Sequence, residues 1–246
     1  KKINIFMLSI IIPVRNESDS LESIMDYYSK NLSDLDYEVL IINDFSKDDT
    51  LKKARNLFKN KNFKVLDNQK KGLGGAINLG IKEASGSNVA IMMADQSDDI
   101  NDLIKYNSLI NTENYDAILG SRFLKESKVL NYPIQKLVLN RIFNYFVGII
   151  FWNKYNDYTN AFKIYKKSTL LEIMPIISES FNIFLEIPLK IISRNYKYKV
   201  VSINWMGRKK GESKFKIKEL GSKYLFTLIY CFIEKNLLNI KKWNLL

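Results

Sequence analysis

Short apolar runs alternate with amphipathic segments over the first 120 residues, and this alternation constrains the fold more than any other feature. The apolar runs predict buried strands, and the amphipathic segments predict helices. The predicted strands cover residues 8–14, 37–43, 63–66, 89–93 and 117–120, with helices at 19–32, 47–59, 74–84 and 100–110. This order is typical of an α/β fold with a mainly parallel sheet and helices on both of its faces.

The pattern becomes less regular after residue 123. We expect further strands at residues 161–165 and 200–205, a helix at 183–194 and a long amphipathic helix from 217 to about 238. No linker rich in proline, glycine or serine marks a boundary. The sequence therefore predicts one domain over residues 1–216 and a C-terminal helical extension over residues 217–246.

Composition restricts the chemistry. Lys and Arg number 38 against 26 Asp and Glu, a net charge of +12, which favours an anionic partner. The positive charge is dispersed without a long basic arm, so we expect no nucleic-acid binding. The chain has no histidine, which excludes histidine-dependent triads and histidine metal sites. The single cysteine, Cys231, excludes an internal disulfide and fits a reducing compartment.

Two features bear on membranes. Residues 1–12 superficially resemble a signal peptide, but they lack a small-residue cleavage site, and a buried first strand explains them better. No run reaches the roughly 20 apolar residues that span a bilayer. The longest candidates are 142–152, which Asn144 interrupts, and 224–233, so we expect no spanning helix.

Acidic residues follow the predicted strand at 89–93. Asp95, Asp98 and Asp99 lie just after it, at the edge where open α/β sheets bind ligands. Carboxylate oxygens are good ligands for a hard divalent cation, and such a cation can bind a diphosphate. The alternative is an acidic loop in which Asp98 or Asp99 caps the helix that begins near residue 100.

Polar residues also follow the first two predicted strands. Glu17 and Asp44 would lie at the same edge of a parallel sheet, where they could accept hydrogen bonds from a base or ribose. Ser46 and Asp48 could contribute to such a site or could be ordinary helix caps.

A glycine run at residues 70–75 (KKGLGG) precedes the predicted helix at 74–84. Glycines permit close backbone approach and offer amide donors to a phosphate. The spacing fits neither a Walker loop nor a dinucleotide fingerprint, and a plain glycine turn is the alternative.

Together with Gly120-Ser121-Arg122-Phe123, the segment 157–163 and the segment 208–215, these elements resemble the family 2 glycosyltransferases of GT-A fold. The resemblance is closest to the polyprenol- and dolichol-phosphate sugar synthases, and it covers residues 8–216. It implies a GT-A domain that transfers a sugar, with inversion, from a nucleotide-diphosphate sugar to a polyprenyl phosphate. It further implies a cytoplasmic enzyme, peripheral on the inner face of the cell membrane.

The resemblance also implies roles for individual residues. The donor nucleotide would contact Pro13, Arg15, Glu17, Asp44, Ser46, Lys71, Gly72 and Ala94. Asp95 and Ser97 would bind Mg²⁺ or Mn²⁺ at the diphosphate. Ser121, Arg122, Arg141, Ser213 and Lys214 would bind the acceptor or its phosphate, and the catalytic set would be Asp95, Arg122, Arg141 and Arg208.

Three positions depart from the family pattern. Met93 stands where the metal motif Asp-x-Asp has its first carboxylate, and methionine cannot replace a carboxylate for a hard ion. Asp95 would then act with Ser97, water or Asp98. Ala161 replaces a usual glycine, and Lys163 a usual arginine.

The predicted chemistry needs no histidine. A lipid phosphate has a second pKa of about 6, so it is mostly dianionic at pH 7 and attacks without a general base. A sugar hydroxyl acceptor would need a carboxylate base, for which Asp157 is the candidate.

Two other functions stay open: a glycosyltransferase that elongates a surface polysaccharide or lipid-linked glycan, and a non-catalytic nucleotide-sugar binding module. The apolar-aromatic segments near 142–152 and 224–233 would dock on anionic lipid, pack on the sheet or form a homodimer.

Overall fold

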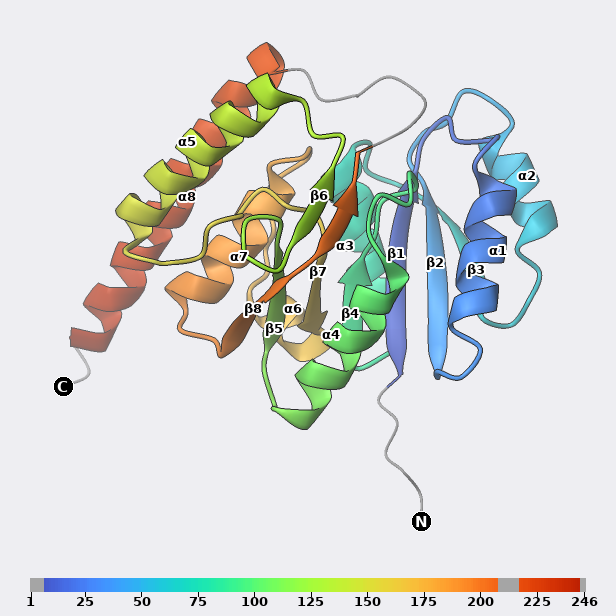
Figure 1. Cartoon of the computed structure of the whole chain (residues 1–246), viewed down its shortest axis with the longest axis horizontal. Helices are drawn as coiled ribbons and strands as arrows, with labels where there is room; N and C mark the ends of the chain where they lie inside the picture. The colour runs from blue at the N-terminus through green and yellow to red at the C-terminus, as the bar shows by residue number, and fades with distance from the viewer. Residues whose placement is uncertain (1–6, 208–216, 244–246) are drawn as a thin grey trace.

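The computed structural model describes residues 7–207 and 217–243 and shows a seven-stranded sheet between helices, with a separate two-stranded sheet (Figure 1). The strand order is β3-β2-β1-β4-β7-β5-β8. The strands are β1 (Leu8–Val14), β2 (Tyr37–Asn43), β3 (Phe63–Asp67), β4 (Asn88–Ile91), β5 (Ala117–Ser121), β7 (Lys163–Lys166) and β8 (Tyr198–Ser202).

All neighbouring strands of this sheet pair in parallel except β7, which is antiparallel to both β4 and β5. The mainly parallel sheet predicted from the sequence is therefore confirmed. Every residue of β1 is buried, as expected of a strand whose two faces are both covered.

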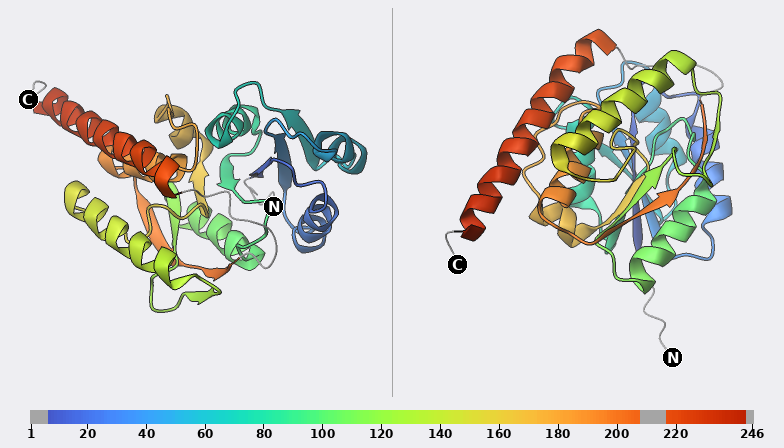
Figure 2. Two further views of the ribbon diagram at one scale, coloured as in Figure 1. Left: turned by 90° about the horizontal axis from the view of Figure 1, so that it is seen from above. Right: turned by 60° about the vertical axis from the view of Figure 1, so that its left-hand side comes forward.

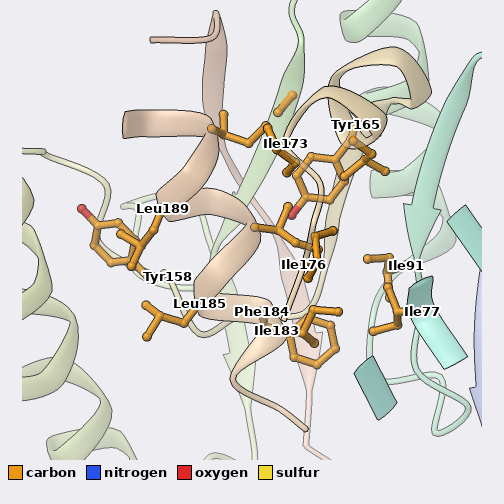
Figure 3. Close-up of a cluster of buried hydrophobic side chains, with 14 of the residues drawn as sticks. Ile77, Ile91, Tyr158, Tyr165, Ile173, Ile176, Ile183, Phe184, Leu185 and Leu189 are labelled. Atoms are coloured by element: carbon orange, nitrogen blue, oxygen red, sulfur yellow. The ribbon is translucent and has the colours of Figure 1, made fainter. Parts of the chain in front are cut away.

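Helices cover both faces of the sheet, as predicted (Figure 2). They are α1 (Leu21–Asn31), α2 (Thr50–Leu57), α3 (Leu73–Glu83), α4 (Ile100–Thr112), α6 (Lys167–Glu172) and α7 (Ile183–Ser193). Alternate residues of β1 point to opposite faces: Ile10 and Ile12 share a core with α1, α2 and α4, whereas Ile11 packs with α3, α6 and α7. In the second core, Leu185 and Leu189 of α7 lie on the same side of that helix as Tyr158, whereas Ile176 and Tyr165 lie on its other side (Figure 3).

The predicted strand at 200–205 is divided in the structure. β8 ends at Ser202, and β9 (Asn204–Met206) pairs instead with β6 (Lys128–Leu130). Ile203 makes the transition, because its N–H donates to Ser121 O at 3.2 Å and its carbonyl accepts from Lys128 N at 3.2 Å. One residue thus bonds to both sheets, which a continuous apolar pattern does not reveal.

Two long helices, α5 (Ile134–Phe151) and α8 (Ile217–Trp243), lie side by side on the outer side of α7 (Figures 1 and 2). Asn144 interrupts the apolar run of the sequence but not the helix. Asn144 donates to Asn140 O at 2.8 Å and accepts from Tyr158 N at 2.6 Å, so its amide is satisfied inside a continuous helix. By length and composition alone, α5 is the single described helix that could cross a membrane, which amends the expectation of none.

The helix α8 shares the core of the domain over part of its length. Tyr224 and Leu228 are buried against the cluster that contains α7. Ion pairs reinforce this contact: Lys190 Nζ lies 3.4 Å from Glu234 Oε2, and Arg194 Nη2 lies 2.6 Å from Glu234 Oε1. Glu234 thus connects α8 to Lys190 in α7 and to Arg194, which directly follows α7.

We expect Leu228→Ala to lower the free energy of unfolding by about 2–5 kcal/mol, because it removes a buried side chain from the core. Ile233→Ala, on the exposed side of the same helix, should change it by less than about 0.5 kcal/mol. Urea denaturation followed by circular dichroism measures both. Equal, small effects would mean that α8 does not contribute to the core.

Candidate active site

A cleft of about 1260 Å³ opens at the carboxyl ends of β1, β2 and β4 and continues between α5 and α8. It brings together ten of the residues singled out in the sequence: Pro13, Arg15, Glu17, Asp44, Lys71, Gly72, Ala94, Asp95, Ser97 and Arg122. The carboxyl ends of neighbouring parallel strands meet at one edge, which is why residues far apart in sequence converge here.

Three other predicted residues lie outside the cleft lining, and three lie outside the described residues. Ser121 is buried, and its Oγ donates to Asn156 Oδ1 at 2.6 Å. Arg141 is exposed on α5, with its guanidinium 4.4 Å from the centre of the Phe123 ring. Ser46 belongs to a contact between two loops. Arg208, Ser213 and Lys214 fall in the segment that the structure does not describe.

The loops after β1 and β2 are bonded to each other. Ser46 Oγ accepts from Asn16 N at 3.0 Å, and Glu17 N donates to Thr50 Oγ1 at 2.9 Å. Ser46 therefore does not cap α2, although Asp48 Oδ1 accepts from Thr50 N at 3.1 Å, at the first residue of that helix. These bonds hold together the two loops that form one wall of the cleft, and Ser46 itself does not line the cleft.

Asp44 connects the end of β2 to the glycine run. Its Oδ1 accepts from Gly72 N at 2.7 Å and from Asn68 Nδ2 at 2.9 Å. Gly72 has a φ of +117°, and a Cβ there would lie 2.5 Å from Glu179 O, so only glycine fits. No bond from the described residues reaches Asp44 Oδ2, which leaves that oxygen for a ligand.

The acidic residues after β4 have separate roles. Asp99 accepts from Asn101 N at 2.9 Å and caps α4. Asp95 Oδ1 accepts from Ser97 N at 3.2 Å in the turn at the cleft. Asp98 is only 3% exposed, and its Oδ1 has no hydrogen-bond partner within the described ranges. Burial, and then the neighbouring Asp95 carboxylate, raise the pKa of Asp98 to about 7.

The cleft end of this loop suits a hard cation. The side chains of Asp95, Ser97 and Asp98 present oxygen atoms there, and oxygen is the ligand that Mg²⁺ and Mn²⁺ prefer. The thioether of Met93, which also lines the cleft, does not fit such an ion.

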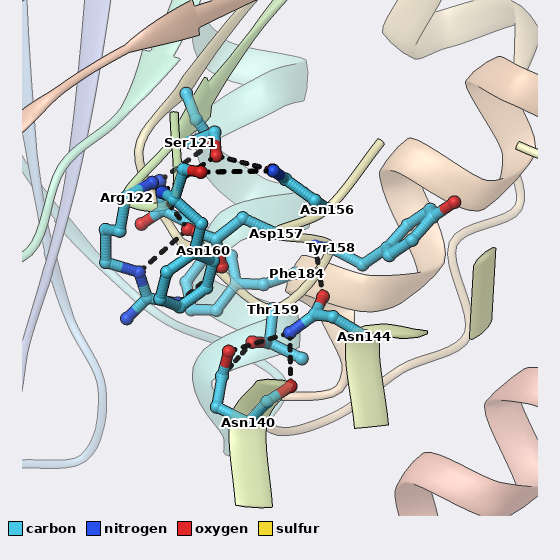
Figure 4. A network of polar contacts seen from close by, with 12 residues as sticks. Ser121, Arg122, Asn140, Asn144, Asn156, Asp157, Tyr158, Thr159, Asn160 and Phe184 are labelled. Carbon is cyan, nitrogen blue, oxygen red and sulfur yellow. Dashed lines mark hydrogen bonds and ion pairs between the residues drawn. The ribbon is translucent and has the colours of Figure 1, made fainter. Parts of the chain in front are cut away.

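A buried ion pair forms the opposite wall (Figure 4). Arg122 Nε donates to Asp157 Oδ2 at 2.8 Å, and Arg122 Nη2 donates to Asp157 Oδ1 at 2.6 Å. Burial alone would lower the pKa of Arg122, but the Asp157 carboxylate raises it above its ordinary value. The guanidinium also lies 5.2 Å from the Tyr132 ring centre and 5.7 Å from that of Trp205. Asp157 is fully buried and engaged at both oxygens, which disfavours it as a general base.

Asparagines hold α5 against the loop that carries Asp157 (Figure 4). Asn140 Nδ2 donates to Thr159 Oγ1 at 2.7 Å, one turn before the contact of Asn144 with Tyr158. These bonds position the α5 wall of the cleft relative to the sheet.

Lys163 is the residue at which the resemblance implies an arginine. It is fully buried and donates to the carbonyls of Tyr158 and Asn160. Burial lowers the pKa of Lys163 to about 7. Because its bonds go to backbone carbonyls below the cleft, Lys163 supports the loop at 157–161 rather than facing a ligand.

The sequence profile of glycosyl transferase family 2 matches residues 9–174. The chain belongs to this family. Dolichol-phosphate mannosyltransferase of Pyrococcus furiosus is 32% identical to this family 2 chain over 219 residues, which cover 87% of the chain and 60% of that protein. Dolichyl-phosphate beta-glucosyltransferase of Dictyostelium discoideum is 26% identical over 215 residues, which cover 80% of this chain and 66% of that protein. The chain thus spans less than two thirds of the length of these relatives.

Solved structures share the fold. Glucosyl-3-phosphoglycerate synthase of Mycobacterium tuberculosis, in complex with Mn²⁺, UDP and phosphoglyceric acid, superposes with a TM-score of 0.70 at 15% identity. The match covers 92% of this chain and 78% of that one. The GT-A fold expected for this family 2 chain is therefore confirmed.

Sequence reasoning missed the apolar end of the cleft in this family 2 chain. Side chains of α5 and α8 form it, including Leu139, Phe143, Phe146, Tyr224, Leu225 and Leu228. Phe143 and Tyr224 meet edge to face with ring centres 5.7 Å apart. Both apolar-aromatic runs were visible in the sequence. They are separated by about 80 residues, however, and no local pattern indicated that they contact each other in the fold.

We expect Asp157→Asn to destabilise the protein by about 3–5 kcal/mol, because Arg122 would remain buried without its carboxylate. Glu126→Gln, an exposed carboxylate in the loop after Arg122, should change stability by less than about 0.5 kcal/mol. Chemical denaturation tests both variants. An unchanged midpoint for Asp157→Asn would contradict the structural role given to this pair.

Proposed function

We propose that the chain is an inverting glycosyltransferase that moves a sugar from a nucleotide-diphosphate sugar to a polyprenyl phosphate. The observation that carries this proposal is the continuity of one cleft. It joins a polar end, at the strand ends with Asp44 and Asp95, to an apolar end between α5 and α8. The names of the similar proteins, a dolichol-phosphate mannosyltransferase and a dolichyl-phosphate beta-glucosyltransferase, support an acceptor of this class.

The donor would bind at the polar end. Asp44, which is fixed by its bonds to Gly72 and Asn68, would accept a hydrogen bond from the nucleoside through Oδ2. Pro13, Arg15, Glu17, Lys71 and Ala94 line the same region. Ser46 would act indirectly by holding the loop after β1.

Asp95 and Ser97 would hold Mg²⁺ or Mn²⁺ beside the diphosphate. When bound, such an ion would offset the negative charge that develops on the leaving diphosphate.

The acceptor phosphate would lie between the two ends of the cleft, near Arg122. Because the Arg122 guanidinium is held by Asp157 in one orientation, it would present its remaining N–H groups without reorganisation. Arg141 lies on the exposed side of α5, from which it would contact the acceptor outside the cleft.

A dianionic lipid phosphate supplies its own nucleophile. A phosphate oxygen forms a bond to the anomeric carbon while the bond from that carbon to the nucleoside-diphosphate oxygen breaks, with inversion at the carbon. No proton has to be removed from the acceptor, since its second pKa of about 6 leaves it deprotonated at pH 7. The chain's contribution is to position two anions that repel each other.

We also propose that α5 and α8 dock on the cytoplasmic face of a membrane. Both helices expose large apolar side chains. They are Ile134, Val138, Leu139, Ile142, Tyr145, Phe146 and Ile149 on α5, Trp152 directly after it, and Leu225, Phe226, Ile229, Phe232, Ile233 and Leu237 on α8. An exposed apolar face of this extent is typical of an interaction surface. Because the cleft opens between the same two helices, this docking would place it where a lipid chain can enter.

The transfer reaction is tested with purified protein, radiolabelled nucleotide sugars, polyprenyl phosphate and Mg²⁺ or Mn²⁺. We expect an organic-soluble sugar phosphodiester, and a loss of about a hundredfold or more in Asp95→Ala, because a residue at the diphosphate is removed. Asp99→Asn, which can still cap α4, should retain activity.

The products also discriminate among the other functions. A lengthened glycan in place of a phosphodiester would favour an elongating glycosyltransferase, and donor binding without turnover would favour a binding module. Full activity in Asp95→Ala would contradict the site assignment.

Docking is tested by sedimentation with vesicles of phosphatidylglycerol and phosphatidylethanolamine. We expect the wild type to bind, more weakly at high salt, and the double variant Ile142→Glu, Ile149→Glu to lose most binding, since charge is costly in an apolar interface. Leu171→Glu, at an exposed apolar residue of α6, is the matched control and should bind like the wild type. Vesicle binding equal in all three proteins would contradict the proposal. A stable dimer that the double variant dissociates would assign the face to a homodimer interface instead.

A further inference from the structure

The corner after β4 has an unusual set of side chains for a cation site. The resemblance to family 2 implies a carboxylate at residue 93, where this chain has Met93, two residues before Asp95. A thioether is a poor ligand for a hard divalent ion. The corner thus needs another oxygen donor if it is to hold one.

Asp98 has the properties of that donor. It lines the cleft with Asp95 and Ser97, it is more than nine-tenths buried, and its Oδ1 has no hydrogen-bond partner in the described part of the chain. A buried carboxylate oxygen without a partner is costly, and proteins rarely keep one without a reason. Asp99 provides the contrast, because its side chain caps α4.

The backbone around Asp98 is held from both sides. Its carbonyl accepts from Tyr27 Oη at 3.3 Å, and the residue forms an isolated bridge with Trp205. The adjacent Ser97 carbonyl accepts from Met206 N at 3.0 Å. These contacts fix the backbone from which the Asp98 side chain extends.

No lysine or arginine in the described ranges donates a hydrogen bond to Asp98 Oδ1. Arg122 and Lys163 act on it electrostatically. However, the charged bonds of Arg122 go to Asp157, and those of Lys163 go to backbone carbonyls. These two cations therefore act on Asp98 by charge and not by a hydrogen bond.

We propose that Asp98 supplies the second carboxylate of a divalent-cation site with Asp95, in place of the carboxylate lost at Met93. The inference rests on the proposed function, because the diphosphate would complete the ligands. No group of three acidic, cysteine or histidine side chains within the described residues can hold a metal by itself. Tight cation binding should therefore require a nucleoside diphosphate.

Electron paramagnetic resonance of free Mn²⁺ measures this binding without activity. The protein is titrated with Mn²⁺ alone and with UDP, GDP, ADP or CDP in separate arms. We expect Mn²⁺ binding that the matching nucleotide strengthens, and an affinity lower by about tenfold or more in Asp98→Asn. Asp99→Asn removes the same charge one residue away and should bind Mn²⁺ like the wild type.

A rescue variant separates a ligand role from a structural one. Met93→Asp combined with Asp98→Asn restores two carboxylates at the corner, and we expect it to recover Mn²⁺ binding. Thermal melting of each variant establishes that it is folded. An amide at residue 98 that weakened binding through misfolding would not be rescued by a carboxylate at residue 93.

The outcomes are distinguishable. Equal Mn²⁺ affinity in wild type and Asp98→Asn, or no recovery in the double variant, would overturn the role of Asp98 and leave the proposed function intact. Sugar transfer by a wild type that binds no Mn²⁺ would also overturn the role of Asp98 as a cation ligand and leave the proposed sugar transfer intact. Neither nucleotide nor Mn²⁺ binding to the folded wild type, together with no transfer, would overturn both proposals.

Discussion

The parallel pairing of β1 with both of its neighbours is the constraint on which the site depends. β1 pairs with β2 from Leu8 to Val14 and with β4 from Leu8 to Ile11, so all three strands end at one edge. The loops that follow them then come into contact, as the bonds between the loops after β1 and β2 show. Since each strand is buried on both faces, slippage of a strand by one residue would exchange its two apolar faces and displace these loops.

The antiparallel strand β7 brings the rest of the site to the same edge. Lys163, at the start of β7, is opposite Ile91 of β4 and Leu119 of β5. Because β7 runs against its neighbours, the residues that precede it emerge where β4 and β5 end. This reversal places Asp157 beside Arg122, which follows β5, and the resulting ion pair closes one side of the cleft.

Much of this fold is predictable because its signals are local. The apolar runs gave β1 and β2 their observed bounds, and Asp99 was one of two predicted caps for α4. The failures are all non-local. The polar Asn144 fits inside α5 because Tyr158 satisfies its amide oxygen, and the turn of Ile203 between two sheets depends on Ser121 and Lys128. Within the site, most of the strand-end residues predicted to bind ligands do line the cleft. Arg141, for which the sequence analysis predicted no helix, lies on α5 outside the lining.

The described lining of the cleft has equal numbers of basic and acidic side chains, although the chain as a whole is strongly positive. Among its described lining residues, Arg15, Lys71, Arg122, Lys136 and Lys223 are matched in number by Glu17, Asp44, Asp95, Asp98 and Glu179. Under the proposed function, the net charge of +12 would attract an anionic ligand over long distances, and directional contacts with the cleft walls would retain it. The association rate of an anionic ligand would therefore depend on the net charge of the chain, and its dissociation rate on contacts within the cleft. Higher ionic strength should lower the association rate more than it changes the residence time.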